Sequence, residues 1–168
     1  MRKHIILLLL YIFSGLIGTA SATTTATFSS ASISGCPDCV ATDPVSGLEA
    51  TGKGLALTLK GLQIDNGVAL SMPGYLFDTS TVGMKINSKT YAFNRVHAPI
   101  TLGFYAYKNG VQVGDTTVIV RAGLGGNVNL SADQRFKGID KLVISIVSNP
   151  YKLETYLIGL VFESAPAL

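Results

Sequence analysis

Hydrophobic and polar positions alternate with a period of two through residues 100–107. One set is Ile100, Leu102, Phe104 and Ala106, and the other is Thr101, Gly103, Tyr105 and Tyr107. A period of two places the two sets on opposite faces of a β-strand. Asn109-Gly110 follows, and Asn-Gly is the strongest short hairpin signal because a type I′ turn needs positive φ at both central residues. The pattern predicts an antiparallel hairpin over 100–120, with Leu102 and Phe104 facing the core.

The same alternation recurs along the chain, with Gly, Pro or Asn at nearly every junction. We expect strands near residues 26–33, 55–59, 68–72, 82–86, 91–96, 128–130, 139–147 and 156–162 besides the hairpin. The first should be an edge strand and the last a central one, since 156–162 is apolar on both faces. No window shows a sustained helical stripe. About eight to ten short strands predict an all-β, antiparallel sandwich, with a barrel as the alternative.

Residues 1–22 have the pattern of a secretory signal peptide. A basic start precedes an apolar run from Ile5 to Gly18, and Ala20-Ser21-Ala22 is a small-x-small cleavage site. An uncleaved anchor is the alternative, but the run is shorter than the roughly 20 residues that span a bilayer. We therefore expect a secreted, extracellular protein whose residues 23–168 form a single β-sandwich domain.

Charge narrows the range of partners. The chain has 13 Lys+Arg and 10 Asp+Glu. Removal of Arg2 and Lys3 leaves 13 − 2 = 11 basic residues, so the net charge of the remaining chain is 11 − 10 = +1. No basic cluster survives, which argues against nucleic acid as a partner. No later apolar run approaches the length of a membrane span, so none is expected after signal cleavage.

Two cysteines, Cys36 and Cys39, lie in a stretch, 34–47, that we expect to be a short cysteine-containing loop. In an oxidising compartment such a pair most plausibly closes on itself as a disulfide. A redox-active pair is the sharper alternative, but it requires a helix directly after the first cysteine. The residues that follow, Val40 to Gly47, have the composition of a loop. Free or intermolecular thiols are the third alternative.

The C-terminal part of the chain resembles a known class of domain. The run 100–114, the strand 116–120, the Phe136-Lys137-Gly138-Ile139-Asp140 segment and the closing strand 156–162 follow each other in this order. Over roughly its last 70 residues, the chain is similar to secreted jelly-roll domains of the carbohydrate-binding, galactose-binding-like type. The resemblance implies a jelly-roll fold and carbohydrate binding. Two departures stand against the functional part. Many such domains place an aspartate just before the last strand, but here Glu154 is the only acid in residues 152–155, and the chain has no tryptophan.

The sequence carries no catalytic, metal-binding or cofactor signature. His97 is the only histidine after residue 22, no Gly-x-Ser-x-Gly is present, and we expect His97 to be an ordinary loop residue. Glu49, Glu154 and Glu163 are the available candidates for paired carboxylates, and nothing in the sequence brings them together. We expect no enzymatic activity, no metal and no cofactor.

Tyrosines are the best candidates for ligand contact. Tyr105 and Tyr107 should point outward from one strand, while Tyr75 and Tyr151 lie at strand ends or in loops. The plainer interpretation is that they only cover surface, with their hydroxyls in water. Asn129 begins the one glycosylation sequon. The expected function is non-catalytic binding of a carbohydrate or cell-surface ligand. The alternative is a small secreted interaction or effector-type protein that acts on a protein partner.

Overall fold

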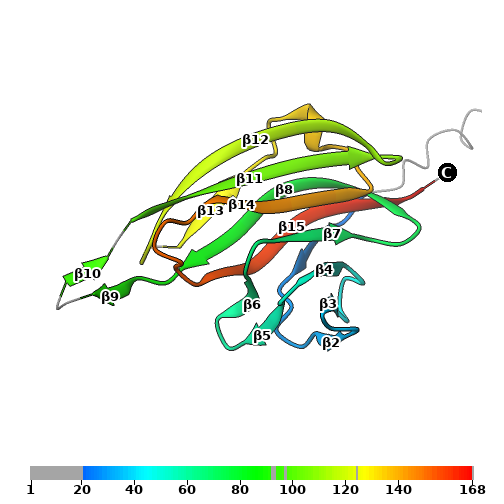
Figure 1. Cartoon of the computed structure of the whole chain (residues 1–168). Coiled ribbons are helices and arrows are strands. Elements are labelled where there is room, and N and C mark those ends of the chain that lie inside the picture. The colour runs from blue at the N-terminus through cyan, green and yellow to red at the C-terminus, as the bar shows by residue number, and fades with distance from the viewer. Residues whose placement is uncertain (1–20, 92–93, 97, 124, 168) are drawn as a thin grey trace, which may run out of the picture.

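The computed structural model describes residues 21–91, 94–96, 98–123 and 125–167. Two antiparallel β-sheets pack face to face as a sandwich (Figure 1). Within the described residues there is no α-helix, and a single 3₁₀ turn, η1, covers Gln134–Phe136. The prediction of an all-β, antiparallel sandwich is confirmed. The proposed signal peptide lies almost wholly outside the described residues.

The first sheet, sheet A, has six strands in the order β13-β8-β15-β6-β5, with β1 paired to β15. Its strands are β1 (Thr23–Ala26), β5 (Ala56–Thr58), β6 (Gly61–Ile64), β8 (Tyr75–Ile86), β13 (Gly126–Asn129) and β15 (Thr155–Pro166). The closing strand β15 lies at the centre of this sheet, where it pairs with β8 along almost its full length. The prediction that the last strand is central is therefore confirmed.

The second sheet, sheet B, has seven strands in the order β12-β11-β14-β7-β4-β3-β2. Its strands are β2 (Ser32–Ser34), β3 (Asp38–Thr42), β4 (Glu49–Lys53), β7 (Gly67–Ser71), β11 (Pro99–Lys108), β12 (Val111–Arg121) and β14 (Lys141–Ser148). Two further strands, β9 (Lys89–Tyr91) and β10 (Asn94–Val96), form a separate ribbon that projects from one end of the sandwich (Figure 1).

Eight of these strands have the connectivity of a jelly roll. Taken in chain order, β6, β7, β8 and β11 alternate between sheets A and B, and so do β12, β13, β14 and β15. Only the β11–β12 hairpin stays within one sheet. The resulting spatial orders, β13-β8-β15-β6 and β12-β11-β14-β7, are those of a double-sheet jelly roll. The predicted jelly roll is confirmed, and β1–β5 extend its sheets on one side.

The β11–β12 hairpin turns at Asn109-Gly110. Both residues have positive φ, 52° and 76°, and Lys108 pairs with Val111 across a two-residue loop. This is the geometry that the Asn-Gly signal predicts. The register shifts by one residue between Ala106 and Tyr107, which leaves Val113 as the extra residue of a β-bulge on β12.

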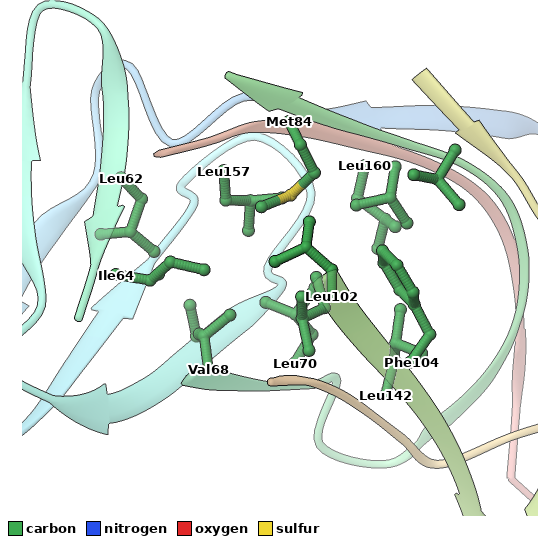
Figure 2. Close-up of a cluster of buried hydrophobic side chains, with 14 of the residues drawn as sticks. Leu62, Ile64, Val68, Leu70, Met84, Leu102, Phe104, Leu142, Leu157 and Leu160 are labelled. Carbon is green, nitrogen blue, oxygen red and sulfur yellow. The ribbon is translucent and has the colours of Figure 1, made fainter. Parts of the chain in front are cut away.

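The core lies between the two sheets. Leu102, Phe104 and Ala106 are fully buried on the inner face of β11. Figure 2 shows Leu102 and Phe104 among the side chains of both sheets, which include Met84 and Leu160 of sheet A. Burial of one such side chain stabilises the fold by about 1.5–3 kcal/mol. The orientation predicted for β11 is confirmed, and it sends the intervening side chains outward.

The N-terminal strand differs from the prediction. Residues 26–33 were expected to form one edge strand, but β1 ends at Ala26 and β2 begins at Ser32, and the two lie in different sheets. Phe28 separates them. It has a positive φ of 55° and is almost completely buried. Burial of this ring against the core turns the chain from one sheet to the other, which the local pattern does not show.

Part of the expected cysteine loop, 34–47, is a strand. Strand β3 occupies Asp38–Thr42 and pairs with β4 over all five residues. Cys39 and Ala41 are buried, and their neighbours on the strand are more exposed. Short, small side chains carry a weak hydrophobic signal, so pairing with β4 rather than local propensity decides this element.

Two other stretches are shorter than expected. Residues 55–59 were expected to be a half-buried strand, but β5 covers only Ala56–Thr58, and Leu59 is fully exposed. Thr58 pairs with Gly61, so Leu59 and Lys60 form a two-residue turn. Residues 91–96 were expected to be one strand; instead β9 ends at Tyr91 and β10 begins at Asn94.

Candidate functional site

Tyr105 and Tyr107 lie side by side along the outer face of sheet B. Both are half-buried, and the residues that alternate with them, Phe104 and Ala106, are in the core. The two tyrosines are therefore brought to one surface by the period of the strand, as the sequence predicts.

The ring of Tyr105 lies back over Gly103. A Cβ atom added to Gly103 would stand 2.7 Å from the Tyr105 hydroxyl oxygen and 2.8 Å from Cε2. Gly103 precedes Tyr105 by two residues and points to the same face, so the ring runs along the strand rather than away from it. Glycine at 103 is what lets the ring approach the sheet this closely. The hydroxyl end of the Tyr105 ring thus lies against Gly103.

Tyr107 is held by residues of the two neighbouring strands. The Nζ atom of Lys141, on β14, lies 4.6 Å from the centroid of the Tyr107 ring. The Tyr107 hydroxyl donates to Oε1 of Gln112, on β12, at 3.5 Å. The register places both partners directly opposite Tyr107. The cation–π contact and the hydrogen bond together fix the orientation of this ring.

Polar and small residues surround the two rings. The register places Asp115 and Val143 on either side of Tyr105, and Thr117 and Ser145 on either side of Gly103. Farther along the sheet, β7 contributes Ala69 next to Val143. We call this surface the tyrosine face; its members are Gly103, Tyr105, Tyr107, Gln112, Asp115, Thr117, Lys141 and Ser145. It combines aromatic rings with a cation, a carboxylate, an amide and hydroxyl groups.

The other two candidate tyrosines are elsewhere. Tyr75 begins strand β8 of sheet A, where it pairs with Pro166, and 42% of it is exposed. Tyr151 lies in the loop between β14 and β15 and is 46% exposed. They lie at opposite ends of the sandwich, because Tyr75 is beside the end of β15 and Tyr151 precedes its start. The four tyrosines thus do not form one site.

Cys36 and Cys39 form a disulfide with each other, as predicted. Strand β3 begins at Asp38, so no helix follows the first cysteine. A redox-active Cys-x-x-Cys stabilises its thiolate at a helix N-terminus, and that feature is missing at this pair. A local disulfide is consistent with an oxidising compartment.

Asn129 is exposed at the end of β13. Its Oδ1 accepts hydrogen bonds from the backbone N–H and the hydroxyl of Ser131, at 2.9 and 2.7 Å. The sequon is therefore at the surface. His97 lies outside the described residues.

The candidate carboxylates do not come together. Glu49 lies on β4 of sheet B, while Glu154 and Glu163 stand near opposite ends of β15. Glu163 follows Glu154 by nine residues along extended chain, a distance of about 30 Å. Paired carboxyl groups of glycosidases are within about 10 Å of each other. Across the described ranges, no cluster of three or more His, Cys, Asp or Glu side chains could hold a metal ion.

A polar cluster that the sequence did not indicate lies at the start of β15. Oε2 of Glu154 accepts hydrogen bonds from the Tyr156 hydroxyl at 2.7 Å and from Nδ2 of Asn87 at 2.8 Å. Burial, together with the hydrogen bond and charge of Glu154, raises the pKa of Tyr156 to about 12. A cleft of about 460 Å³ lies beside it, lined by Lys60, Asn87, Ser88, Lys152 and Glu154. Its residues come from separate loops, so no local pattern reveals it.

No protein family and no curated protein matches the chain. In the part of the chain that the structure describes, no helix has the length and apolar character of a membrane span. A structure of a family two carbohydrate esterase from Cellvibrio japonicus aligns with 88% of this chain at 16% sequence identity and a TM-score of 0.48. The chain spans 36% of the length of that structure. This is a weak structural similarity to a carbohydrate-active protein, and at this level it carries no argument about function.

Proposed function

We propose that this chain is a secreted, non-catalytic protein that binds carbohydrate through the tyrosine face. The observation that carries the proposal is the position of Tyr105 over Gly103. A sugar ring has an apolar face of C–H groups that packs against a flat aromatic ring, and hydroxyl groups around its rim. The side chain of Tyr105 lies along the strand, so a sugar bound on the tyrosine face would pack against its ring.

Polar residues beside the two rings supply hydrogen-bond donors and acceptors for the hydroxyl groups of a sugar. Lys141 donates hydrogen bonds and Asp115 accepts them. The Gln112 amide and the hydroxyl groups of Thr117 and Ser145 can donate and accept hydrogen bonds. Tyr105 and Tyr107 are two residues apart on one strand, so their Cα atoms are about 7 Å apart. This separation favours a ligand of more than one sugar ring, bound along the direction of β11.

A glycan array followed by calorimetry tests the proposal. We expect the protein to bind one or more oligosaccharides and expect Tyr105→Ala and Tyr107→Ala each to weaken binding roughly tenfold, since an aromatic contact contributes about 1 kcal/mol beyond its buried area. Tyr75→Ala and Tyr151→Ala are the matched controls, because they remove exposed tyrosines from other surfaces. They should leave the affinity unchanged.

Three results would contradict all or part of the proposal. Absence of binding to any glycan would remove it and leave a protein partner as the target. Binding that survives both Tyr105→Ala and Tyr107→Ala would place the site elsewhere. Turnover of a bound oligosaccharide would contradict the non-catalytic part. Secretion is tested separately: the exported protein should begin at Thr23 on N-terminal sequencing, and retention of residues 1–22 would contradict cleavage.

A further inference from the structure

Sheet B ends in a strand that is unusually long for a sheet edge. Strand β12 has 11 residues and pairs, among the described strands, only with β11. The strands at the other edges of the two sheets have three or four residues; they are β1, β2, β5 and β13. Very short edge strands are one way in which proteins prevent pairing with other chains. The edge at β12 lacks that protection.

The 3₁₀ turn η1 packs against β12 at Gly114, where an added Cβ would stand 2.5 Å from Cβ of Arg135. The rest of β12 carries few of the other common protections. Residues 111–121 contain no lysine and no proline, which are the residues that usually block an edge. The bulge is confined to Val113, so the stretch from Gly114 to Arg121 keeps a continuous register with β11. Ile119 is 69% exposed on the outer face of this stretch. From Asp115 to Arg121 this edge is therefore regular in register and apolar in part.

The charges on β12 are complementary to those of a second copy of itself. Asp115 and Arg121 are its only charged residues, both are exposed, and both lie on the outer face. In an antiparallel pair of two β12 strands centred on Val118, Asp115 of each copy stands opposite Arg121 of the other. In the same register Thr117 stands opposite Ile119. Opposite charges directly across a strand pair stabilise it, and like charges destabilise it.

The same charges disfavour other registers. A pair centred on Asp115 would place the two carboxylates opposite each other, and a pair centred on Arg121 would place two guanidinium groups opposite each other. Arg135 also lies near Asp115, but its guanidinium already donates to the carboxylate of Asp133 at 2.7 and 3.0 Å. Charge therefore favours the register centred on Val118, which alone among these three pairs opposite charges.

We propose that two copies of this chain associate through β12, antiparallel and centred on Val118, to form a symmetric dimer. The interface is isologous, as in most dimers, and the two seven-stranded sheets become one sheet of 7 + 7 = 14 strands. Backbone hydrogen bonds supply the association, as in other cases of strand addition to an exposed edge. The charge pairs set the register.

The dimer would also extend the tyrosine face. Asp115 and Arg121 lie on the same side of the sheet as Tyr105, so both copies present their tyrosines on one continuous surface. The two Tyr105 residues would be about 25 Å apart, because three strand spacings separate them across the sheet and six residues separate them along the strands. Bivalent binding to a polymeric glycan follows if the proposed function holds, but the dimer does not depend on it.

Charge reversal tests the register. We expect the protein to sediment as a concentration-dependent dimer in analytical ultracentrifugation. Asp115→Arg alone and Arg121→Asp alone should each raise the dissociation constant about tenfold or more, and the double exchange should restore it. Lys85→Glu reverses an exposed charge on β8 of the opposite sheet and should have no effect. A monomer at all concentrations, a dimer insensitive to both single changes, or no rescue by the double exchange would each overturn the proposal.

Cross-linking provides a second measurement that does not depend on the charged residues. Thr117→Cys and Ile119→Cys replace exposed residues, and the proposed register places them opposite each other in two different copies. A mixture of the two variants should form an intermolecular disulfide about tenfold faster than either variant alone, because facing positions meet the Cα separation that a disulfide needs. Equal rates in all three samples would contradict the register. Neither test involves a glycan, so a failed dimer and a failed glycan site are distinguishable.

Discussion

Tyr105 lies over Gly103 so closely that any side chain at 103 would displace its ring, because an added Cβ would stand 2.7 Å from the hydroxyl oxygen. The contact joins an aromatic residue and a glycine two positions apart on the same face of one strand. It holds the Tyr105 side chain along the strand. A substitution at Gly103 can therefore test the effect of this contact on ligand binding separately from its effect on folding stability.

Gly103→Ala should weaken glycan binding several-fold while the fold stays intact. The atoms that the new methyl group meets belong to the far end of the Tyr105 side chain, which can swing away at low cost. The free energy of unfolding should change by less than about 1 kcal/mol. Calorimetric titration and urea denaturation measure the two effects. Gly83→Ala, at an in-strand glycine of sheet A with no contact under 3.5 Å, is the control; equal effects of both changes on affinity would contradict the role of Gly103.

Phe104→Ala should destabilise the fold by about 3–5 kcal/mol. Phe104 is fully buried in the core that both sheets share, and its removal costs the transfer free energy and leaves a cavity. Tyr107→Ala, three residues along the same strand and on the outer face, should cost only about 1 kcal/mol, mainly from the lost Lys141 contact. Urea denaturation measures both. Similar losses for the two variants would contradict the assignment of the faces.

Gly61→Ala should destabilise the protein by about 2 kcal/mol or more. Gly61 has a φ of +124°, and a Cβ there would stand 2.5 Å from the carbonyl oxygen of Leu157 on β15. Backbone atoms of a central strand cannot move aside cheaply. Gly74→Ala is the matched control, because Gly74 also has a positive φ, +77°, but no atom within 4 Å. It should cost about 1 kcal/mol in thermal or urea denaturation. Equal costs would show that the close approach of β6 to β15 does not matter.

Tyr156 should ionise at a higher pH in the folded protein than in the unfolded chain. Its pKa is raised to about 12 by burial and by Glu154, whereas the unfolded chain ionises it at its ordinary value of 10. Between pH 10 and 12 the folded protein holds one more proton than the unfolded chain. This contribution to stability is complete below pH 10 and is lost as the pH rises toward 12.

Glu154→Gln isolates the cause of that shift. The change removes the negative charge next to the Tyr156 hydroxyl but leaves the ring buried, so the pKa of Tyr156 should fall toward 10 without reaching it. A spectrophotometric titration of tyrosinate measures this directly. Glu163→Gln, near the other end of β15, should leave the titration unchanged. An unaltered curve for Glu154→Gln would contradict the hydrogen bond at 2.7 Å.

The sequence by itself determined the class of the fold and the faces of its principal hairpin. Asn109-Gly110 predicts a turn with two positive φ angles, and the alternation around Phe104 decides which side chains face inward. These features are local, because a strand period and a two-residue turn depend on residues a few positions apart. The same locality made Tyr105 and Tyr107 predictable as outward-facing residues.

Only the tertiary structure decided what those tyrosines meet. Lys141 reaches the Tyr107 ring because β14 pairs with β11, and Asn87 meets Glu154 because two loops converge at one end of the sandwich. The division of residues 26–33 between two sheets has the same origin, since burial of Phe28 in a shared core redirects the chain. Such contacts join residues tens of positions apart. Their partners are selected by sheet register and core packing, and the local sequence pattern carries no information about either.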